Sequence, residues 1–458
     1  MDRGTVLVVG AGPAGLFASR KIAAAGYRVI ILNRDIKPGG LAEYGIYPQK
    51  FHMKGGLRKQ FFKFLEMPNL SYFGNTPVLG HGSLTLGDLR QWNPSAIVFA
   101  VGAQGTKTLG LPGEEGKGLY SAKDFVFHYN QLPPFASMDF SIGRRVAIVG
   151  MGNVMVDIAR WLLEDMPGER PEEVAVIARR GPFEAKFDKK EFDYVEMHLD
   201  RGSFSEELRR VQERVQGCGQ DISKLAESTF PWLDQPLAQI APGKLSFRFL
   251  TSPSAVLLDE AGRINRLRVT ENDLVLKGDT TAARATDQTA ELEFDTLIYA
   301  IGDIVDPALG LPCDKKGYYI TNPDESRHEG AAYEVFDPQT GKVLAGEFVV
   351  GWARKASDGL VGKARFDAEQ GCDHILKYLE TAPSRIAPSL EDITRGFSRR
   401  GTRAVDKGEI KLLARTEEAE AKAHNLPAIK FPTNEQMLAA IEKEKSASGS
   451  SKSGSAAA

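Results

Sequence analysis

The sequence predicts an α/β protein with two Rossmann-like dinucleotide-binding domains, and three observations support this prediction. One strand–turn–helix–strand unit with a glycine fingerprint opens the chain, and a second begins near residue 144. The 458 residues are 42% apolar, which is enough for two domains with their own cores. The formal net charge is -2, so the whole chain has no global attraction for nucleic acid or an anionic membrane.

The first unit runs from residue 5 to residue 32, with a predicted strand, the loop GAGPAG, a helix and a second strand. Gly10 permits the tight turn, and Gly12 lets the backbone approach a pyrophosphate. Gly15 lets the helix pack closely on the strand, while Ala14 lies in its first turn. The helix N-terminus offers N–H groups and a positive dipole end to phosphates. The unit therefore predicts a bound dinucleotide, the alternative being a tight turn without a ligand.

The end of the second strand departs from the usual pattern. A carboxylate commonly accepts hydrogen bonds from the adenosine ribose there, but this chain has Asn33, followed by Arg34 and Asp35. An amide oxygen can accept a hydrogen bond without the charge that makes a carboxylate strong. We expect either weaker binding of the adenosine end or a substitute role for Asp35.

The second unit has a predicted strand at 144–149, a turn, a helix at 154–163 and a second strand in EEVAVIARRGP. Its turn contains Gly150, Met151, Gly152 and Asn153, and Val154 begins the helix. Met155 occupies the third fingerprint position, where bulk costs helix–strand packing but does not block a phosphate.

Two adjacent arginines, Arg179 and Arg180, end the second strand of this unit. A guanidinium makes bidentate hydrogen bonds to a phosphate, so the pair favours NADPH over NADH through the 2'-phosphate. The alternative is two solvated surface arginines. Two loops call for two nucleotides, and the economical assignment is FAD on the first and NADP(H) on the second.

Other features limit the functional classes. Cys218, Cys313 and Cys372 are far apart and form no C-x-x-C, which argues against a disulfide framework, a zinc site and a redox thiol pair. We recognise no charged leader and no run of about 18 apolar residues, so we expect a cytoplasmic protein without a membrane partner. The small polar residues at 443–458 predict a disordered tail.

Several ordered motifs carry a resemblance to a known family. They are GGLAEYGIYPQ, LPGEEGKGLYSAKDFVFHYNQLP, GMGNVMVDIAR, ARRGPFEAKFDKKEF and GWARKASDGLV, continued by RGFSRRGTRAVDKGEI and NEQMLAAI. The chain resembles the adrenodoxin-reductase type of ferredoxin-NADP reductase over nearly all of its length before the tail. The resemblance implies a glutathione-reductase-like fold, with a discontinuous FAD-binding domain at 1–104 and 328–442 and an inserted NADP-binding domain at 105–327.

The resemblance also implies site residues. Those expected around FAD, besides the glycine loop, are Ala14, Asn33, Leu41, Trp352, Gly359, Leu360 and Val361. Those expected around NADP(H) are Met151, Gly152, Asn153, Val154, Arg179, Arg180 and Glu191. Trp352 would give a flat apolar wall, and Gly359 would let the backbone come close where nicotinamide meets flavin. For Glu191 the alternative is an ordinary surface charge.

Four features depart from the family pattern. Asn33 replaces Glu, Met155 replaces Ala, and Gln49-Lys50 replaces an Asp-His pair, so a protonatable group expected near the flavin is missing. Residues 322–346 are longer and more polar than the family's connection, and we interpret them as a surface hairpin of unknown purpose.

The function implied is hydride transfer from nicotinamide C4 to flavin N5, followed by one-electron release to a ferredoxin-like iron-sulfur protein. This chemistry needs no acid–base side chain and no metal site in the chain. Two alternatives stay open: a flavoprotein subunit of a larger iron-sulfur complex, like the small subunit of glutamate synthase, and a non-catalytic binding protein on the same fold.

A basic stretch offers a docking hypothesis. Five cations precede the first acid of a predicted helix: Lys50, Lys54, Arg58, Lys59 and Lys63. Like charges at i,i+4 oppose helix formation, so a benefit elsewhere is plausible, and an acidic ferredoxin would supply it by electrostatic steering. The basic group Lys186, Lys189 and Lys190 invites the same interpretation. The alternative for both is a solvated face.

Overall fold

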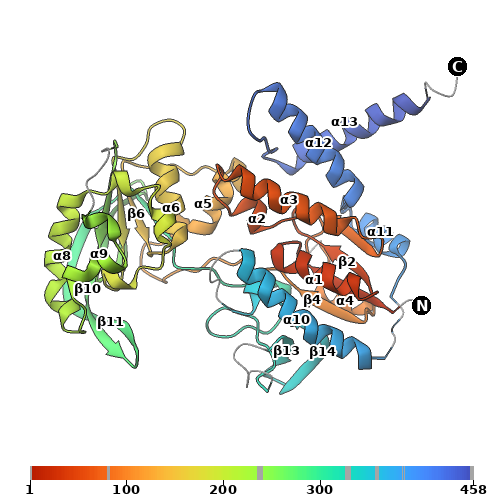
Figure 1. Cartoon of the computed structure of the whole chain (residues 1–458), viewed down its shortest axis with the longest axis horizontal. Helices are drawn as coiled ribbons and strands as arrows, with labels where there is room; N and C mark the ends of the chain where they lie inside the picture. Colours follow the sequence, from red (N-terminus) through yellow and green to blue (C-terminus); the bar gives the residue numbers. More distant parts are fainter. Residues whose placement is uncertain are drawn as a thin grey trace. The chain divides into compact units, whose positions relative to one another are not determined.

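Two units, each with a parallel sheet, make up the chain in the computed structural model (Figure 1). The structure describes residues 3–79, 83–234, 241–324, 332–355, 361–383, 385 and 387–453. The first unit comprises 1–106, 127–138 and 303–458, and the second comprises 107–126 and 139–302. The chain thus enters the second unit at residue 107 and leaves it after residue 302, apart from a short return to the first unit at 127–138. The boundaries predicted from the sequence were residues 105 and 328.

The first unit contains a seven-stranded sheet in the order β13-β14-β4-β1-β2-β3-β15. Its strands are β1 (Thr5–Val9), β2 (Arg28–Leu32), β3 (Leu70–Gly74), β4 (Ala96–Phe99), β13 (Glu334–Asp337), β14 (Lys342–Val349) and β15 (Val405–Asp406). The five strands from β14 to β3 are parallel, and the two at the edges are antiparallel to their neighbours. Strands β1 and β4 are buried along their whole length, because apolar clusters cover both faces of the sheet.

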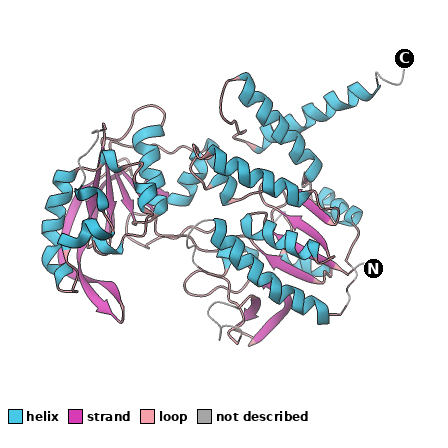
Figure 2. Cartoon of the chain, viewed as in Figure 1, coloured by secondary structure: helices cyan, strands magenta, loops and turns pink. Residues whose placement is uncertain are grey.

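Helices of the first unit cover this sheet (Figure 2). They are α1 (Pro13–Ala24), α2 (Leu41–Tyr44), α3 (Phe51–Leu65), α4 (Leu86–Gln91), α10 (Val361–Thr381), α11 (Leu390–Arg399), α12 (Lys407–Ala423) and α13 (Asn434–Ser453), with short turns η1 (Phe135–Ser137), η7 (Pro307–Leu309) and η9 (Gly351–Ala353). Helices α1 and α10 pack side by side on one face. Among the described residues, no helix has the length and apolar character needed to cross a membrane.

Two segments differ from their sequence-based expectations. Strands β13 and β14 do form a hairpin within 322–346, but β14 continues to Val349 and pairs in parallel with β4, so this strand is part of the main sheet. Helix α13 extends to Ser453, within the stretch 443–458 that was expected to be disordered, and residues 454–458 lie outside the described residues.

The second unit pairs a five-stranded parallel sheet, in the order β5-β12-β6-β7-β8, with a three-stranded antiparallel sheet, β11-β10-β9. The strands are β5 (Leu119–Ser121), β6 (Arg145–Val149), β7 (Glu173–Ile177), β8 (Lys244–Arg248), β9 (Thr251–Leu258), β10 (Ile264–Lys277), β11 (Thr280–Glu293) and β12 (Thr296–Tyr299). An apolar core with side chains from both sheets joins them.

Short helices complete the second unit. They are α6 (Asn153–Arg160), the π-helical turn η2 (Trp161–Asp165), η3 (Pro182–Glu184), α7 (Lys189–Phe192), η4 (Glu196–His198), α8 (Arg201–Gln216), η5 (Ile222–Lys224), α9 (Leu225–Ser228) and η6 (Pro231–Asp234). Helix α5 (Ala122–Tyr129) contributes residues to both units. Phenylalanines of α7, α8 and β8 pack together, with ring centroids about 6 Å apart for Phe192, Phe204 and Phe247.

Two candidate dinucleotide sites

The first glycine loop joins β1 to α1 and has the geometry that its fingerprint predicts. Gly10 has a φ of 101°, and a Cβ there would lie 2.5 Å from the carbonyl oxygen of Ala100. A Cβ at Gly15 would lie 2.0 Å from the carbonyl oxygen of Gly10, so helix and loop are in contact. Gly12 caps α1, and a Cβ there would meet no atom within 4 Å. This open position at a helix N-terminus fits a pyrophosphate.

Asn33 is turned into the protein at the end of β2, with 6% of its surface exposed. Its Oδ1 accepts a hydrogen bond from the N–H of Ala11, in the glycine loop, at 2.9 Å. Its Nδ2 donates to the carbonyls of Asp35 and Lys37, at 2.8 and 3.1 Å, and to the hydroxyl of Tyr72 at 3.2 Å. Asn33 therefore fixes the shape of the loop, and only one lone pair of Oδ1 remains for a ribose hydroxyl.

Other residues expected around FAD lie close to this loop. Gly40, just before Leu41 and α2, approaches so closely that its Cβ would lie 3.0 Å from the Cα of Gly12. Gly351 lies over Ala14, because a Cβ on Gly351 would be 2.7 Å from that of Ala14.

The remaining expected FAD residues come from the C-terminal part of the chain. Trp352 follows Gly351 in η9 and is partly buried, and Val361 begins α10 against the core. Gly359 and Leu360 lie outside the described residues. The structure thus brings Ala14, Leu41 and Trp352 near one loop from three separate parts of the sequence.

A buried ionic cluster that no sequence motif predicts lies beside α2. The carboxylate of Glu43 lies 2.7 Å from Arg58 and 3.4 Å from both Lys37 and Lys430, and Lys37 also pairs with Glu417 at 2.5 Å. Burial alone would raise the pKa of Glu43, but the three cations hold it well below its usual value.

This cluster corrects the interpretation of the basic helix α3. Lys54 is 6% exposed and donates to Oδ1 of Asn130 at 2.6 Å, and burial lowers the pKa of Lys54 to about 6. Arg58 points its guanidinium at Glu43. Two of the five cations are therefore held by interior partners, and of the five only Lys59 and Lys63 are exposed.

The second glycine loop joins β6 to α6 with nearly the same backbone. Gly150 has a φ of 119°, and a Cβ there would lie 2.2 Å from the carbonyl oxygen of Ala300. Gly152 caps α6, and a Cβ there would meet no atom within 4 Å. Met155 is completely buried, so its side chain fills the space between α6 and its surroundings without covering the loop. This loop also fits a pyrophosphate.

The segment after β7 is tied to this loop. The N–H of Lys186 donates to the carbonyl of Met151 at 2.9 Å, and the N–H of Asp188 donates to Oδ1 of Asn153 at 2.6 Å. Asp188 caps α7, which contains Glu191, so that partly exposed glutamate lies in a helix anchored to the loop. Val154 is 47% exposed at the start of α6.

The arginine pair follows β7 at the carboxyl edge of the sheet, where ligands of such sheets bind. Arg179 is exposed and Arg180 is partly exposed, and within the described residues neither guanidinium has a protein partner. Both line a hollow of about 310 Å³ whose other walls are small or polar residues: Ser252, Asn272, Thr281, Ala282, Ala283 and Ala285. The sequence predicted the arginines but not these neighbours, which lie far along the chain.

Comparisons with known proteins agree with this geometry. Residues 4–228 match the family described as pyridine nucleotide-disulphide oxidoreductase. The NADPH-ferredoxin reductase FprA of Mycobacterium tuberculosis is 28% identical over 94% of this chain and 98% of its own length. The mitochondrial NADPH:adrenodoxin oxidoreductase of Arabidopsis thaliana is 26% identical over 95% of each chain. The solved structure of Mycobacterium tuberculosis FprA in complex with NADPH superimposes with a TM-score of 0.79, at 26% identity, covering 96% of this chain and 99% of the other.

Two open glycine loops on two parallel sheets, in a chain that matches these relatives over most of its length, define an oxidoreductase that uses a flavin and a pyridine nucleotide. Over nearly its whole length the chain is similar to the adrenodoxin-reductase type of ferredoxin-NADP reductase. FAD and NADP are the cofactors of this family.

Proposed function

We propose that this protein is a FAD-dependent enzyme that moves electrons between NADP(H) and a ferredoxin-like iron-sulfur protein. The observation that carries the proposal is the second loop, where an open glycine at a helix N-terminus lies in the same unit as two guanidinium groups that have no partner among the described residues. The first loop supports it, because a second open glycine gives the flavin nucleotide its own site.

The first unit would hold FAD. Gly10 and Gly15 shape the loop, Gly12 admits the pyrophosphate, and the start of α1 supplies its N–H groups. Leu41 and Trp352 would give the ring system apolar walls, with Val361 nearby and Gly359 and Leu360 proposed from the family motif. Asn33 would act mainly by fixing the loop, since its amide is already bonded to protein atoms.

The second unit would hold NADP(H). Gly150 shapes its loop, and Met151, Gly152, Asn153 and Val154 would border the pyrophosphate. Arg179 and Arg180 would bind the 2'-phosphate by charge-assisted hydrogen bonds. Glu191 would accept from the ribose on the nicotinamide side. When bound, the two cofactors supply hydride transfer and one-electron release.

Fewer basic residues support a docking surface on α3 than the sequence suggested, because Lys54 and Arg58 have interior partners. We propose an acidic ferredoxin, supported on α3 by the exposed Lys59 and Lys63, and in the second unit by the exposed Lys186, Lys189 and Lys190. We also propose that the enzyme works in the cytoplasm, in line with its three free thiols. Co-elution of native protein with a second chain would instead favour a subunit of a larger complex.

The test is an anaerobic titration of the purified holoprotein with NADPH and, separately, with NADH, following the visible absorbance of the flavin. We expect bleaching by NADPH at a much lower concentration than by NADH. Reduction of an iron-sulfur ferredoxin should then follow with NADPH as donor. A purified protein without flavin, or a flavin that neither nucleotide reduces, would contradict the proposal and favour a non-catalytic binding protein.

A matched control compares the KM for NADPH of two double variants, each of which removes a pair of arginines from the second unit. The double variant Arg179→Ala/Arg180→Ala should raise the KM for NADPH by at least about 100-fold, because each guanidinium–phosphate contact is worth roughly 1.5–3 kcal/mol. The variant Arg266→Ala/Arg268→Ala removes two cations that pair with Glu291 instead and should leave that KM unchanged.

A further inference from the structure

Strand β10 carries two consecutive buried polar residues, Glu271 and Asn272, which are 8% and 1% exposed. The pairing of β10 with β11 shifts register between Thr270 and Asn272. The extra residues lie on β11, where residues 286–288 stand opposite Glu271. The two neighbouring polar side chains of β10 are buried where this strand passes the end of β7.

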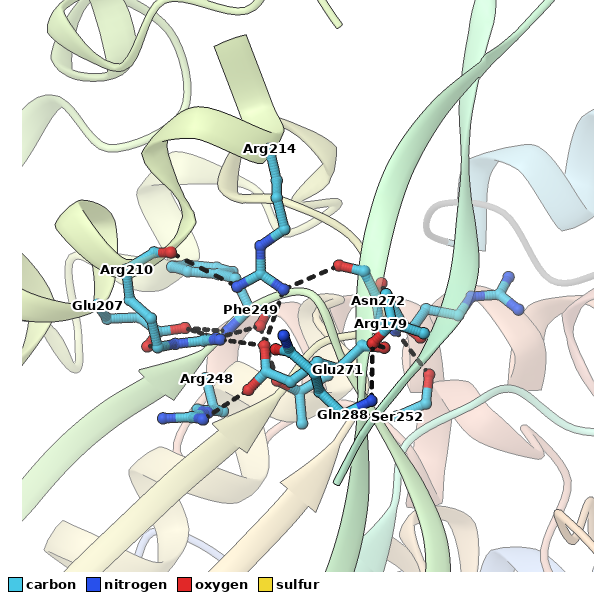
Figure 3. A network of polar contacts seen from close by, with 12 residues as sticks. Arg179, Glu207, Arg210, Arg214, Arg248, Phe249, Ser252, Glu271, Asn272 and Gln288 are labelled. Atoms are coloured by element: carbon cyan, nitrogen blue, oxygen red, sulfur yellow. Dashed lines mark hydrogen bonds and ion pairs between the residues drawn. The ribbon is translucent and has the colours of Figure 1, made fainter. Parts of the chain in front are cut away.

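Asn272 and its neighbours hold the backbone that carries the arginine pair (Figure 3). The Nδ2 of Asn272 donates to the carbonyl of Arg179 at 3.0 Å and to the hydroxyl oxygen of Ser252 at 2.8 Å. The N–H of Leu250 donates to the carbonyl of Arg180 at 3.1 Å, and the N–H of Asn272 donates to the carbonyl of Leu250 at 2.7 Å. The carbonyls of both arginines are therefore fixed by one connected set of hydrogen bonds.

Glu271 supports this set of hydrogen bonds through a group of arginines, as Figure 3 shows. Its carboxylate binds Arg210, Arg214 and Arg248, the last two at 2.8 and 2.7 Å. Arg214 also donates to the carbonyl of Asn272 at 3.0 Å. Burial alone would raise the pKa of Glu271, but the three arginines lower it. The carboxylate therefore stays charged and keeps Asn272 in place at neutral pH.

Ser252 faces the same hollow as the arginines. Its hydroxyl oxygen accepts from Asn272, so its own proton is left to donate, and the described residues offer it no partner. Thr281, which also lines the hollow, donates its proton to Glu184 at 2.6 Å and can only accept from a ligand. Ala282, Ala283 and Ala285 line the hollow with side chains that are single methyl groups.

We propose that Ser252 is a third donor to the 2'-phosphate of NADP(H), and that Asn272 is a positioning residue that sets both the Arg179 backbone and the Ser252 hydroxyl. Both residues then determine the preference for NADP(H) over NAD(H). The inference rests on the proposed function of the arginine pair, which it extends.

The test measures binding of 2',5'-ADP and of 5'-ADP to the holoprotein by calorimetry, which needs no turnover. Ser252→Ala should weaken binding of 2',5'-ADP by about 10-fold, since a hydrogen bond to a charged group is lost, and leave 5'-ADP unchanged. Ser252→Thr keeps the hydroxyl and should bind like the wild type. Ser254→Ala, on the same strand with its hydroxyl on the carbonyl of Arg268, is the control.

Asn272→Ala should weaken 2',5'-ADP at least as much, and it should raise the KM for NADPH without changing kcat at saturation or the KM for NADH. If this buried variant fails to fold, the serine variants decide. Near-wild-type binding by Ser252→Ala would overturn the inference while loss of binding in Arg179→Ala/Arg180→Ala left the proposed function standing. A wild type that does not distinguish 2',5'-ADP from 5'-ADP would overturn both.

Discussion

The two glycine loops share a backbone but differ in what surrounds them. Around the first loop, Gly15 is in contact with the loop backbone, and Asn33 is buried with both its Oδ1 and its Nδ2 hydrogen-bonded to protein atoms. Around the second, Met155 takes the third position, and the strand end carries exposed arginines instead of a buried amide. The same fingerprint therefore builds a socket fixed by the protein in one unit and a more open surface in the other, as expected for a resident flavin and an exchanging nucleotide.

The largest effect is expected at the ionic cluster beside the first loop. Glu43→Gln leaves the buried Lys37 and Lys430, and the partly buried Arg58, without their shared carboxylate, and it should lower the free energy of unfolding by about 3–5 kcal/mol. Urea unfolding followed by flavin fluorescence would measure it. Glu66→Gln removes an exposed partner of Lys411 and should change stability by less than about 1 kcal/mol.

The same carboxylate makes the first unit sensitive to acid. The folded pKa of Glu43 lies below its unfolded value of about 4.5, so its stabilisation is complete above that pH and is lost as pH falls toward the folded pKa. Unfolding of the wild type at a series of pH values should show this loss, and Glu43→Gln should flatten it. An equally steep acid dependence in the variant would contradict this assignment.

A second substitution tests whether Asn33 is structural. In the wild type, the carbonyl oxygens of Asp35 and Lys37 accept hydrogen bonds from Asn33. In Asn33→Asp, a carboxylate without a donor would face these two oxygens. Stability should fall by about 3 kcal/mol, with loss of flavin. Asn425→Asp, at an exposed position just after α12, should cost less than about 1 kcal/mol. Retained stability with weakened flavin binding would instead mean that Asn33 acts on the ribose.

Gly15→Ala probes the tight contact in the first loop. The added methyl would lie 2.0 Å from the Gly10 carbonyl oxygen, so α1 must move away, at a cost of about 1–3 kcal/mol. The fraction of purified protein that retains flavin should fall, as its absorbance ratio would report. A variant with full flavin content and wild-type stability would show that the first loop is not held more rigidly by the protein than the second loop.

The smallest change in stability is expected at Gly152. Because a Cβ there meets no protein atom within 4 Å, Gly152→Ala should alter unfolding by no more than about 0.5 kcal/mol. Its methyl would nevertheless occupy space intended for the pyrophosphate and raise the KM for NADPH by about 10-fold. An unchanged KM would mean that the nucleotide does not approach this loop.

Sequence reasoning succeeded where a feature is local. Both strand–loop–helix units were predicted within a few residues, because the glycines, the apolar strands and the helix starts are adjacent in the chain. The exposed arginines were predicted for the same reason, since they directly follow β7. Patterns of adjacent residues therefore predict the backbone of each loop and the charged side chains beside it.

It failed where a partner lies far along the chain. Lys54 looked like a surface cation, but Asn130, 76 positions away, makes it an interior one. Asn272 carried no recognisable signal, because its function depends on contact with Arg179, 93 positions away. Asn33 was identified but read as a ligand-binding residue, since nothing local indicates that Tyr72 and the carbonyl of Lys37 engage its amide.

The pairing of β14 with β4 sets the order in which the molecule can be completed during synthesis. Glu347 lies beside Ile97 in the sheet, so about 250 residues must emerge from the ribosome between the two strands. The second unit, which ends at residue 302, is finished before β14 has been made. The nascent chain can therefore fold the second unit first. Until β14 has been made, the edge of β4 with which it pairs stays uncovered in the N-terminal sheet.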